Sequence, residues 1–335
     1  MIGRAETKPA ESSAPDLSRT AMFLVRESAV RKELKLDARQ WRSIEAALAE
    51  VDGPLWALRD VPPEKSSAPA AQLRAAFQTE LDAALEPKQK ERLDQLVLQT
   101  LSLASLAAPS VADKLELTAE QRERIRAALD ETERAANETS TAASKKAQAA
   151  GRRRMLDALT EEQRERFIGL LGRPFPVAKV RQAYAQAPEL KDLDGWINSP
   201  PLALADQRGK VVVLNFWAFG CINCVHNLPW YKGWHEKFAE RGVVVLGVHT
   251  PETQADRNPN SLRKKVKEDG ILYPVAIDTR AQTWAAWANH MWPSTYLIDK
   301  RGYVRYWWYG ELNWQGAEGE KFMRSKIEEL LAEKD

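Results

Sequence analysis

The chain has 335 residues, of which 44% are hydrophobic and 29% charged, so it has the composition of a globular protein and the length of two domains. Its 49 Lys and Arg against 47 Asp and Glu give a net charge of +2, which argues against an electrostatic nucleic-acid binder. No apolar run approaches the roughly 20 residues that span a bilayer, and residues 1–10 are too polar for a signal peptide. We therefore expect a protein that neither binds nucleic acid nor spans a membrane.

The first half of the sequence predicts helices. Residues 1–20 are rich in Pro, Ser, Glu and Ala, lack hydrophobic periodicity and predict a disordered lead-in. Residues 21–171 consist largely of Ala, Leu, Glu, Arg and Gln with little Gly, which indicates a helical domain. Inside it, the Pro- and Ser-rich stretch 61–69 predicts a loop.

One short pattern recurs four times in this helical region. The four copies are Leu36–Gln40, Leu85–Gln89, Leu117–Gln121 and Leu159–Gln163. Each places a capping side chain three residues before a Gln, which is the spacing of a capping box at a helix start. An apolar residue follows each cap by seven positions; these residues are Ile44, Leu93, Ile125 and Phe167. The uneven separation of the copies predicts a bundle or a set of hairpins rather than a regular solenoid.

These Leu-Thr-x-x-Gln starts resemble those of the CpxP/Spy-like periplasmic helical proteins, and the resemblance favours the cell envelope. A set of ordinary capping boxes is the alternative explanation for the same pattern.

The second half changes character after residue 171. Arg173–Pro176 and Asn198–Pro201 contain helix breakers, so we expect a linker over 172–201. Residues 202–335 alternate β-rich runs with helical segments, which predicts an α/β domain. The predicted strands are Val211–Phe216, Val243–Val248, Tyr273–Ile277, Thr295–Asp299 and Tyr303–Trp308. A hairpin turn at Asp299–Gly302 makes the sheet mixed, and residues 316–331 predict a closing helix.

The chain has only two cysteines, Cys221 and Cys224. They follow a buried strand directly and precede a segment that predicts a helix, broken or kinked at Pro229. Cysteines three apart on a first helical turn lie on one side, close enough to bond. Unpaired N–H groups and the helix dipole favour a thiolate at Cys221, so its pKa should lie below the usual value of about 8.5. A thiolate attacks disulfides, and Cys224 is the natural resolving thiol.

Other uses of the two cysteines fit less well. A structural zinc site needs four ligands, and the sequence has no second cysteine pair. A c-type haem needs His after the second cysteine, where this chain has Val225. We therefore expect no metal and no cofactor; a redox-inert pair is the remaining alternative.

The segment Phe216–Cys224 resembles the thioredoxin active site, and more closely that of the TlpA/DipZ-like branch of this fold. The segments that also match the branch, in order and spacing over about 202–315, are Gly247–Glu252, Gly270–Val275 and Met291–Asp299. The resemblance implies a thioredoxin-like domain with a mixed sheet flanked by helices, placed after the all-helical domain.

The resemblance also implies roles for individual residues. Pro293 should be cis and lie beside Cys221, in a loop whose backbone pairs with an extended substrate peptide. Trp217 and Trp292 should shape the contact with substrate. Glu252 should act as general base for Cys224, with a loop glutamate in water as the alternative.

Two further residues, Asn215 and His249, lie at or near the ends of the predicted strands beside the cysteines. Asn215 stands where thioredoxin itself has a buried Asp, and Asn cannot take up a proton; this departure is the reason to look to Glu252. His249, at the end of a predicted strand, either lines the site or is a hydrogen-bonded structural residue.

The leading hypothesis is a thiol-disulfide oxidoreductase that reduces protein disulfides through Cys221 and Cys224. The resemblance implies a protein disulfide or dithiol substrate, an upstream thiol-disulfide electron donor and a periplasmic or other extracytoplasmic location. One alternative is a helical binding protein whose thioredoxin domain only docks a partner. A thiol peroxidase is another, although Leu214 and Ala218 occupy the positions of the peroxidase Pro and Thr.

Overall fold

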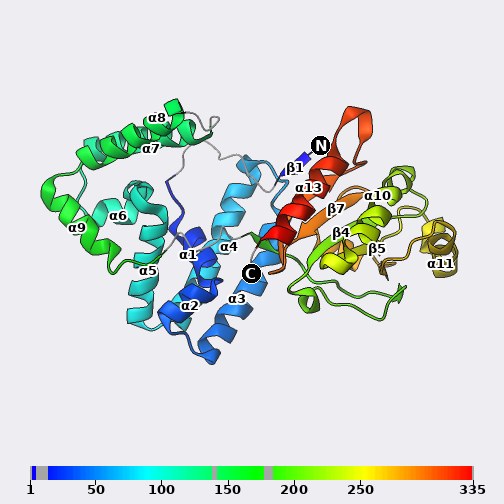
Figure 1. The fold of residues 1–335 in the computed structure, drawn as a ribbon. Coiled ribbons are helices and arrows are strands. Elements are labelled where there is room, and N and C mark those ends of the chain that lie inside the picture. The colour runs from blue at the N-terminus through cyan, green and yellow to red at the C-terminus, as the bar shows by residue number, and fades with distance from the viewer. Residues whose placement is uncertain (1, 5–13, 138–141, 177–183, 334–335) are drawn as a thin grey trace. The chain divides into compact units, whose positions relative to one another are not determined.

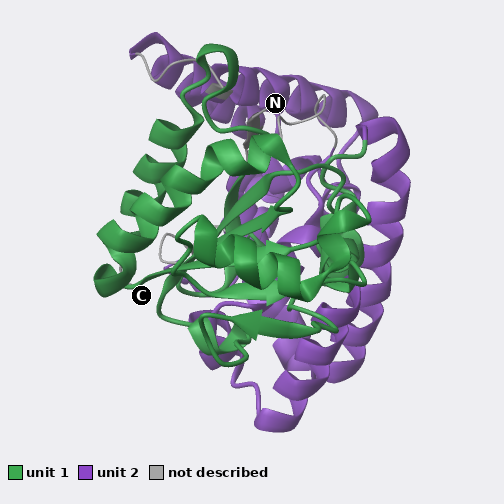
Figure 2. Ribbon diagram, turned by 90° about the vertical axis from the view of Figure 1, so that its right-hand side faces the viewer, with its two compact units in different colours: residues 1–7, 52–61, 184–335 green, residues 8–51, 62–183 purple. Residues whose placement is uncertain are grey.

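The computed structural model describes residues 2–4, 14–137, 142–176 and 184–333, and the chain divides into two compact units. The helical unit comprises residues 8–51 and 62–183, and the sheet unit comprises residues 1–7, 52–61 and 184–335 (Figure 2). Residues 52–61 therefore belong to the sheet unit although they lie far ahead of it in the sequence. This assignment departs from the simple two-domain order that the sequence predicted.

The first half of the chain is helical, as predicted (Figure 1). Its helices are α1 (Leu17–Val25), α2 (Ser28–Leu34), α3 (Ala38–Ala57), α4 (Pro63–Ala84), α5 (Pro87–Leu101), η1 (Ser102–Ala107), α6 (Pro109–Lys114), α7 (Ala119–Asn137), α8 (Ala142–Asp157) and α9 (Glu161–Leu171).

Two predicted irregular segments are shorter than the sequence suggested. Helix α1 begins inside the predicted lead-in 1–20, because the Asp16 carboxylate accepts the backbone N–H of Arg19 at 2.8 Å and caps the helix. Residues 2–4 of the same lead-in form strand β1, while residues 5–13 lie outside the described residues. The predicted loop 61–69 is wrong beyond residue 62. Pro63 begins α4, since proline at a first helical position sacrifices no hydrogen bond.

All four predicted helix starts are confirmed. In each, the backbone N–H of the cap residue donates to the side chain of the Gln three positions later; the distances are 3.1 Å at Asp37, 2.8 Å at Glu86 and 3.0 Å at both Thr118 and Thr160. The apolar residues seven positions after the caps are buried, with Ile44 and Ile125 completely inaccessible. The repeated pattern therefore sets both the start and the inward face of four helices.

The glutamines of these starts also join in pairs. Gln40 Nε2 donates to Gln89 Oε1 at 2.7 Å, and Gln121 Nε2 donates to Gln163 Oε1 at the same distance. Each amide group bonds in addition to a carbonyl at the end of another helix; the acceptors are Leu34, Ala84, Leu115 and Ala158. One glutamine pair thus ties two helix starts to two helix ends, where free N–H and C=O groups need partners.

The sheet unit contains one mixed eight-stranded sheet among the described residues. Its strands are β1 (Ile2–Arg4), β2 (Ala185–Gln186), β3 (Gly195–Ile197), β4 (Val211–Trp217), β5 (Val243–His249), β6 (Val275–Ile277), β7 (Ser294–Ile298) and β8 (Tyr303–Tyr309). They lie in the order β1-β8-β7-β4-β5-β6-β3, and β2 also pairs with β8. Strands β4, β5 and β6 are parallel, whereas β7 runs antiparallel to β4 and to β8, so the predicted mixed sheet is confirmed.

The predicted linker 172–201 is partly wrong, because β2 and β3 lie within it and pair with β8 and β6. Strands of two and three residues are too short to show an alternating pattern in the sequence.

The helices of the sheet unit are α10 (Ile222–Phe238), α11 (Pro259–Glu268), α12 (Gln282–Ala286) and α13 (Gly319–Ala332), with short 3-10 turns η3 (Ala205–Gln207), η4 (Ala239–Arg241), η5 (Ala255–Arg257) and η6 (Trp314–Gly316). Among the described residues, no helix combines the length and the apolar character needed to cross a membrane.

Strand β4, which is labelled in Figure 1, is buried along its whole length and organises the core of the sheet unit. Val211, Val213 and Trp217 join a cluster with residues of α10, α11 and α13. The alternate residues Val212, Leu214 and Phe216 join a second cluster on the other face. A strand covered on both faces explains the uninterrupted apolar run in the sequence.

Replacing Gln163 by Ala should lower the free energy of unfolding of the helical unit by about 1–2 kcal/mol, because it removes a capping interaction and one of the two acceptors of the Gln121 amide. Denaturant unfolding followed by circular dichroism measures this loss. Glu165→Ala, at an exposed position of the same helix, is the control and should change little. Equal losses in the two variants would contradict the role of the glutamine pair.

Candidate active site

The two cysteines lie where β4 passes into α10. Cys221 is the N-cap residue of α10 and Cys224 lies in its first turn. Pro229 lies inside α10, which continues to Phe238 as the sequence predicted, so the helix is not broken at this residue. Both thiols are unbonded; Cys221 is 7% exposed and Cys224 is fully buried. Cys221 is therefore the more accessible of the two thiols.

The pKa values of the two cysteines are shifted in opposite directions. The pKa of Cys221 is lowered, chiefly by the thiol of Cys224 and to a smaller extent by the Cys224 backbone N–H, and burial opposes this. Burial, together with the neighbouring Cys221 sulfur, raises the pKa of Cys224. The predicted direction for Cys221 is confirmed. Since the thiolate is the attacking form, Cys221 is suited to attack and Cys224 to wait in the protonated state.

Glu252 lies within reach of this pair on the loop after β5. Its side chain is exposed, and its charge and hydrogen bond oppose the lowering of the Cys221 pKa. The same charge contributes to the raised pKa of Cys224. The structure thus places the carboxylate at the thiols, while its role as a general base stays a prediction.

The loop between β4 and Cys221 is held by two buried side chains. His249 Nε2 accepts the backbone N–H of Phe219 at 3.4 Å, and the two rings stack with their centroids 5.4 Å apart. The Asp256 carboxylate accepts the N–H of Gly220 at 2.9 Å, and a Cβ at Gly220 would lie 2.9 Å from it. Of the two alternatives for His249, this geometry favours a structural residue that also borders the site.

Sequence reasoning missed Asp256, because this residue of η5 meets Gly220 only through folding. A second carboxylate oxygen of Asp256 accepts the N–H and hydroxyl of Thr253, both at 2.8 Å. Asp256 therefore connects the loop after β5 to the residue before the reactive cysteine.

The predicted substrate-contacting residues differ in their exposure. The Trp292–Pro293 bond is cis, as the resemblance implied. Trp292 is partly exposed, stacks on Trp284 with ring centroids 3.9 Å apart and donates Nε1 to the carbonyl of Thr250 at 3.0 Å. Trp217 is fully buried, which speaks against direct contact between its side chain and a substrate. The partly exposed Phe219 and the 63% exposed Ile222 flank Cys221 instead.

Buried polar side chains of α10 and of the sheet are joined by hydrogen bonds. The Tyr231 hydroxyl bonds to the Thr295 hydroxyl at 2.7 Å and accepts from Asn227 Nδ2 at 3.1 Å. Burial raises the pKa of Tyr231, and the charges of both cysteines contribute. Asn215, opposite Thr295 in the sheet, donates to the carbonyl of Leu246 at 3.0 Å. A neutral amide here donates to a buried carbonyl without placing a charge in the core.

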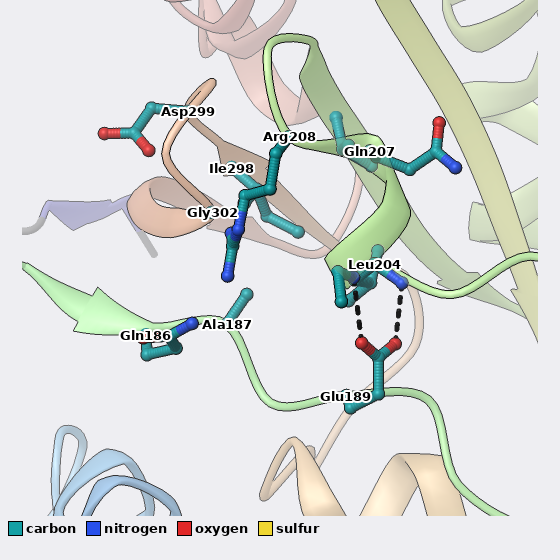
Figure 3. A pocket seen from close by; sticks show the side chains of 11 residues that line it. Gln186, Ala187, Glu189, Leu204, Gln207, Arg208, Ile298, Asp299 and Gly302 are labelled. Carbon is teal, nitrogen blue, oxygen red and sulfur yellow. Dashed lines mark hydrogen bonds between the residues drawn. The ribbon is translucent and has the colours of Figure 1, made fainter. Parts of the chain in front are cut away.

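A cavity of about 130 Å³ lies elsewhere in the sheet unit (Figure 3). It is bordered by Val212, at the start of β4, whereas the cysteines follow the end of that strand. On its wall the Glu189 carboxylate accepts the N–H groups of Leu204 and Ala205 at 2.7 and 2.9 Å (Figure 3). Within the described part of the chain, no three His, Cys, Asp or Glu side chains gather as a metal site.

Comparison with known proteins agrees with this geometry. Residues 183–307 match the AhpC/TSA family. They form a thioredoxin-fold domain related to the thiol-disulfide oxidoreductases. The family match leaves the helical unit unassigned, and the likeness of its helix starts to CpxP/Spy-like proteins stays a prediction.

Three relatives illustrate the match. Protein DipZ of Mycobacterium tuberculosis is 43% identical over 128 residues, which are 37% of this chain and 18% of DipZ. The thiol-disulfide oxidoreductase ResA of Geobacillus thermodenitrificans is 32% identical over 116 residues, 35% of this chain and 62% of ResA. The thiol-disulfide oxidoreductase YkuV of Bacillus subtilis is 25% identical over 146 residues, 44% of this chain and 94% of YkuV. This chain therefore spans less than a fifth of the DipZ protein.

Two substitutions should move the pKa of Cys221 in opposite directions. Cys224→Ala should raise it, because the Cys224 thiol is the main group that lowers it, and Glu252→Gln should lower it by removing a negative charge. Alkylation of Cys221 at neutral pH should therefore be about three- to tenfold slower in Cys224→Ala and about three- to tenfold faster in Glu252→Gln. The ultraviolet absorbance of the thiolate during a pH titration gives the pKa directly. Glu240→Gln, beyond the far end of α10, is the matched control for Glu252→Gln, and equal effects of the two would contradict this account.

The buried His249 should make the sheet unit sensitive to acid. Burial lowers the pKa of His249 from 6.5 to about 4, so between these values the unfolded chain binds a proton that the folded chain does not. Stability is therefore complete above about pH 6.5 and falls as the pH drops towards 4, by about 2–3 kcal/mol.

His249→Asn should remove this part of the acid dependence, measured as the free energy of unfolding at several pH values. His226→Asn, which changes an exposed histidine of α10, should retain it. An unchanged pH slope in His249→Asn would show that the titration of His249 is not responsible.

Proposed function

We propose that the whole chain is a thiol-disulfide oxidoreductase that reduces disulfides in proteins. The observation that carries the proposal is the asymmetric cysteine pair: a low-pKa, accessible Cys221 beside a buried, protonated Cys224. Relatives whose names state this activity, ResA and YkuV, support it.

The residues support a two-step exchange. The Cys221 thiolate attacks one sulfur of the substrate disulfide, a new S–S bond forms, and the other substrate sulfur leaves with the bonding electrons. Cys224 then loses its proton and attacks the Cys221 sulfur, which releases the second substrate thiol and leaves a Cys221–Cys224 disulfide. The proposed upstream donor is a dithiol that returns two electrons to this disulfide.

Glu252 is proposed to take the proton of Cys224. The carboxylate lies beside the pair, and its charge raises the pKa of both thiols. Once Cys221 is joined to substrate, its sulfur no longer carries a charge, so the thiolate that forms at Cys224 meets less repulsion.

We propose a periplasmic or other extracytoplasmic location. Structural disulfides persist in oxidising compartments, so a protein that reduces them has its substrates there. The resemblance of the four repeated helix starts to those of CpxP/Spy-like periplasmic proteins supports the same location. Fractionation of the producing cells, with this chain found in the cytoplasm, would refute it.

Two competing functions are distinguishable by experiment. A thiol peroxidase would consume peroxide, and it would do so even with Cys224→Ser; against it, the fully buried Leu214 and Ala218 leave no hydroxyl at the position of the peroxidase Thr. A docking protein would use the fold without the thiols, so Cys221→Ser would leave its properties unchanged.

Reduction of insulin with dithiothreitol as donor tests the proposal. The wild type should accelerate it, and Cys221→Ser should abolish the acceleration because the attacking thiolate is gone. Cys224→Ser should instead accumulate a mixed disulfide with substrate, seen by mass spectrometry without reductant. Equal rates for wild type and Cys221→Ser would refute the assignment.

The direction of electron flow follows from the potential of the Cys221–Cys224 couple. Equilibration with glutathione should give a value near thioredoxin's, about −270 mV, whereas a value near about −120 mV would identify an oxidant.

A further inference from the structure

Residues 52–61, the end of α3 and the turn after it, supply part of the core of the sheet unit. Trp56 is 3% exposed. Its ring meets those of Trp287, Tyr296 and Trp307 edge to face, with centroids 6.0, 5.8 and 5.7 Å away. Its Nε1 donates to the carbonyl of Trp287 at 2.9 Å. Burial of this indole and its hydrogen bond makes the segment an integral part of the sheet unit.

Arg59, one turn later, donates to the Trp56 carbonyl at 3.1 Å and makes three hydrogen bonds to more distant parts of the same unit. Its nitrogens donate to the carbonyl of Ala288 at 3.0 Å, to the Tyr296 hydroxyl at 3.2 Å and to the Tyr309 hydroxyl at 2.9 Å. Its side chain is 7% exposed and lies over the Trp56 ring at 4.2 Å. The adjacent Asp60 carboxylate balances the charge at 3.2 Å and accepts the Tyr309 hydroxyl at 2.6 Å.

These contacts hold the chain on both sides of the Trp292–Pro293 loop. The carbonyls of Trp287 and Ala288 follow the end of α12, where a helix leaves C=O groups without partners. Tyr296 lies three residues after Pro293, in β7. Tyr309 lies opposite Ser294 in the sheet, and the next residue, Gly310, donates to the Pro293 carbonyl at 2.8 Å. A single side chain, Arg59, thus connects the start of the loop to the strands that follow it.

We propose that Trp56 and Arg59 are positioning residues for the Trp292–Pro293 loop, and that they set how well this loop receives the extended chain of a protein disulfide. The inference rests on the proposed function for its substrate. Both residues precede the family match, which begins at residue 183. The thioredoxin-fold domain of this chain is therefore supported by two residues that lie outside the matched segment.

The proposal predicts a loss that depends on the size of the substrate. A small disulfide needs only the Cys221 sulfur, whereas a protein disulfide also needs the loop. In Arg59→Gln, the loop loses a charged donor to the Ala288 carbonyl, and the KM for insulin should rise about fivefold while kcat stays within about twofold. The rate with hydroxyethyl disulfide and the pKa of Cys221 should stay as in the wild type. Arg59→Lys should restore part of the affinity, and Trp56→Phe should behave like Arg59→Gln.

A matched control separates positioning from general destabilisation. Leu330→Ala opens a cavity in the other core cluster, under α13, and should lower the melting temperature without changing the KM for insulin. All variants are assayed at a temperature at which circular dichroism shows them folded. An Arg59→Gln protein with wild-type KM, or a KM raised equally in Leu330→Ala, would overturn the proposal.

Amide hydrogen exchange tests the positioning of the Trp292–Pro293 loop without a catalytic assay. Arg59→Gln should speed amide exchange in peptides covering 287–296 and leave those of α10 unchanged. If the wild type did not reduce insulin, the proposed function would fail, yet this exchange pattern would still support the positioning of the loop. Unchanged exchange at 287–296 would refute that positioning even in an active enzyme.

Discussion

The interaction between the two cysteine side chains is the one on which the chemistry depends. The Cys224 thiol stabilises a negative charge on Cys221, while complete burial keeps Cys224 protonated and Cys221 retains 7% exposure. This arrangement requires a helix that begins at Cys221 and a completely buried strand before it. The sheet provides both, because β4 is central in it and its two faces are covered by separate apolar clusters.

Around the pair, neutral and charged groups have different tasks. Asn215, Tyr231 and Thr295 supply neutral hydrogen-bonding groups between α10 and the sheet. The two carboxylates of the site differ in exposure. Asp256 is buried and holds the backbone of Gly220, whereas Glu252 is exposed beside Cys221. The negative charge of Glu252 opposes the thiolate at Cys221.

The four capping boxes stabilise the helical unit at two levels. Each glutamine completes a capping box on its own helix and also bonds a glutamine of another box. Thr160 and Gln163 show the first level, with a backbone N–H satisfied in each direction. The second level joins helices whose starts lie 49 or 42 residues apart, at Gln40 and Gln89 and at Gln121 and Gln163. Uneven spacing along the chain is compatible with such pairing, since only the geometry of the helix ends must match.

What the sequence by itself determined follows from short-range physics. The spacing of Cys221 and Cys224, the apolar run of β4 and the four capping boxes depend on neighbours within a few residues, so their structures could be predicted. The thioredoxin-like domain with a mixed sheet followed from the resemblance. The tertiary structure alone decided that Trp56 and Arg59 belong to the sheet unit, that Asp256 holds Gly220, and that two- and three-residue strands complete the sheet. These contacts join residues that are distant in the chain, and no local periodicity or propensity records which buried carbonyl or aromatic surface a distant side chain will meet.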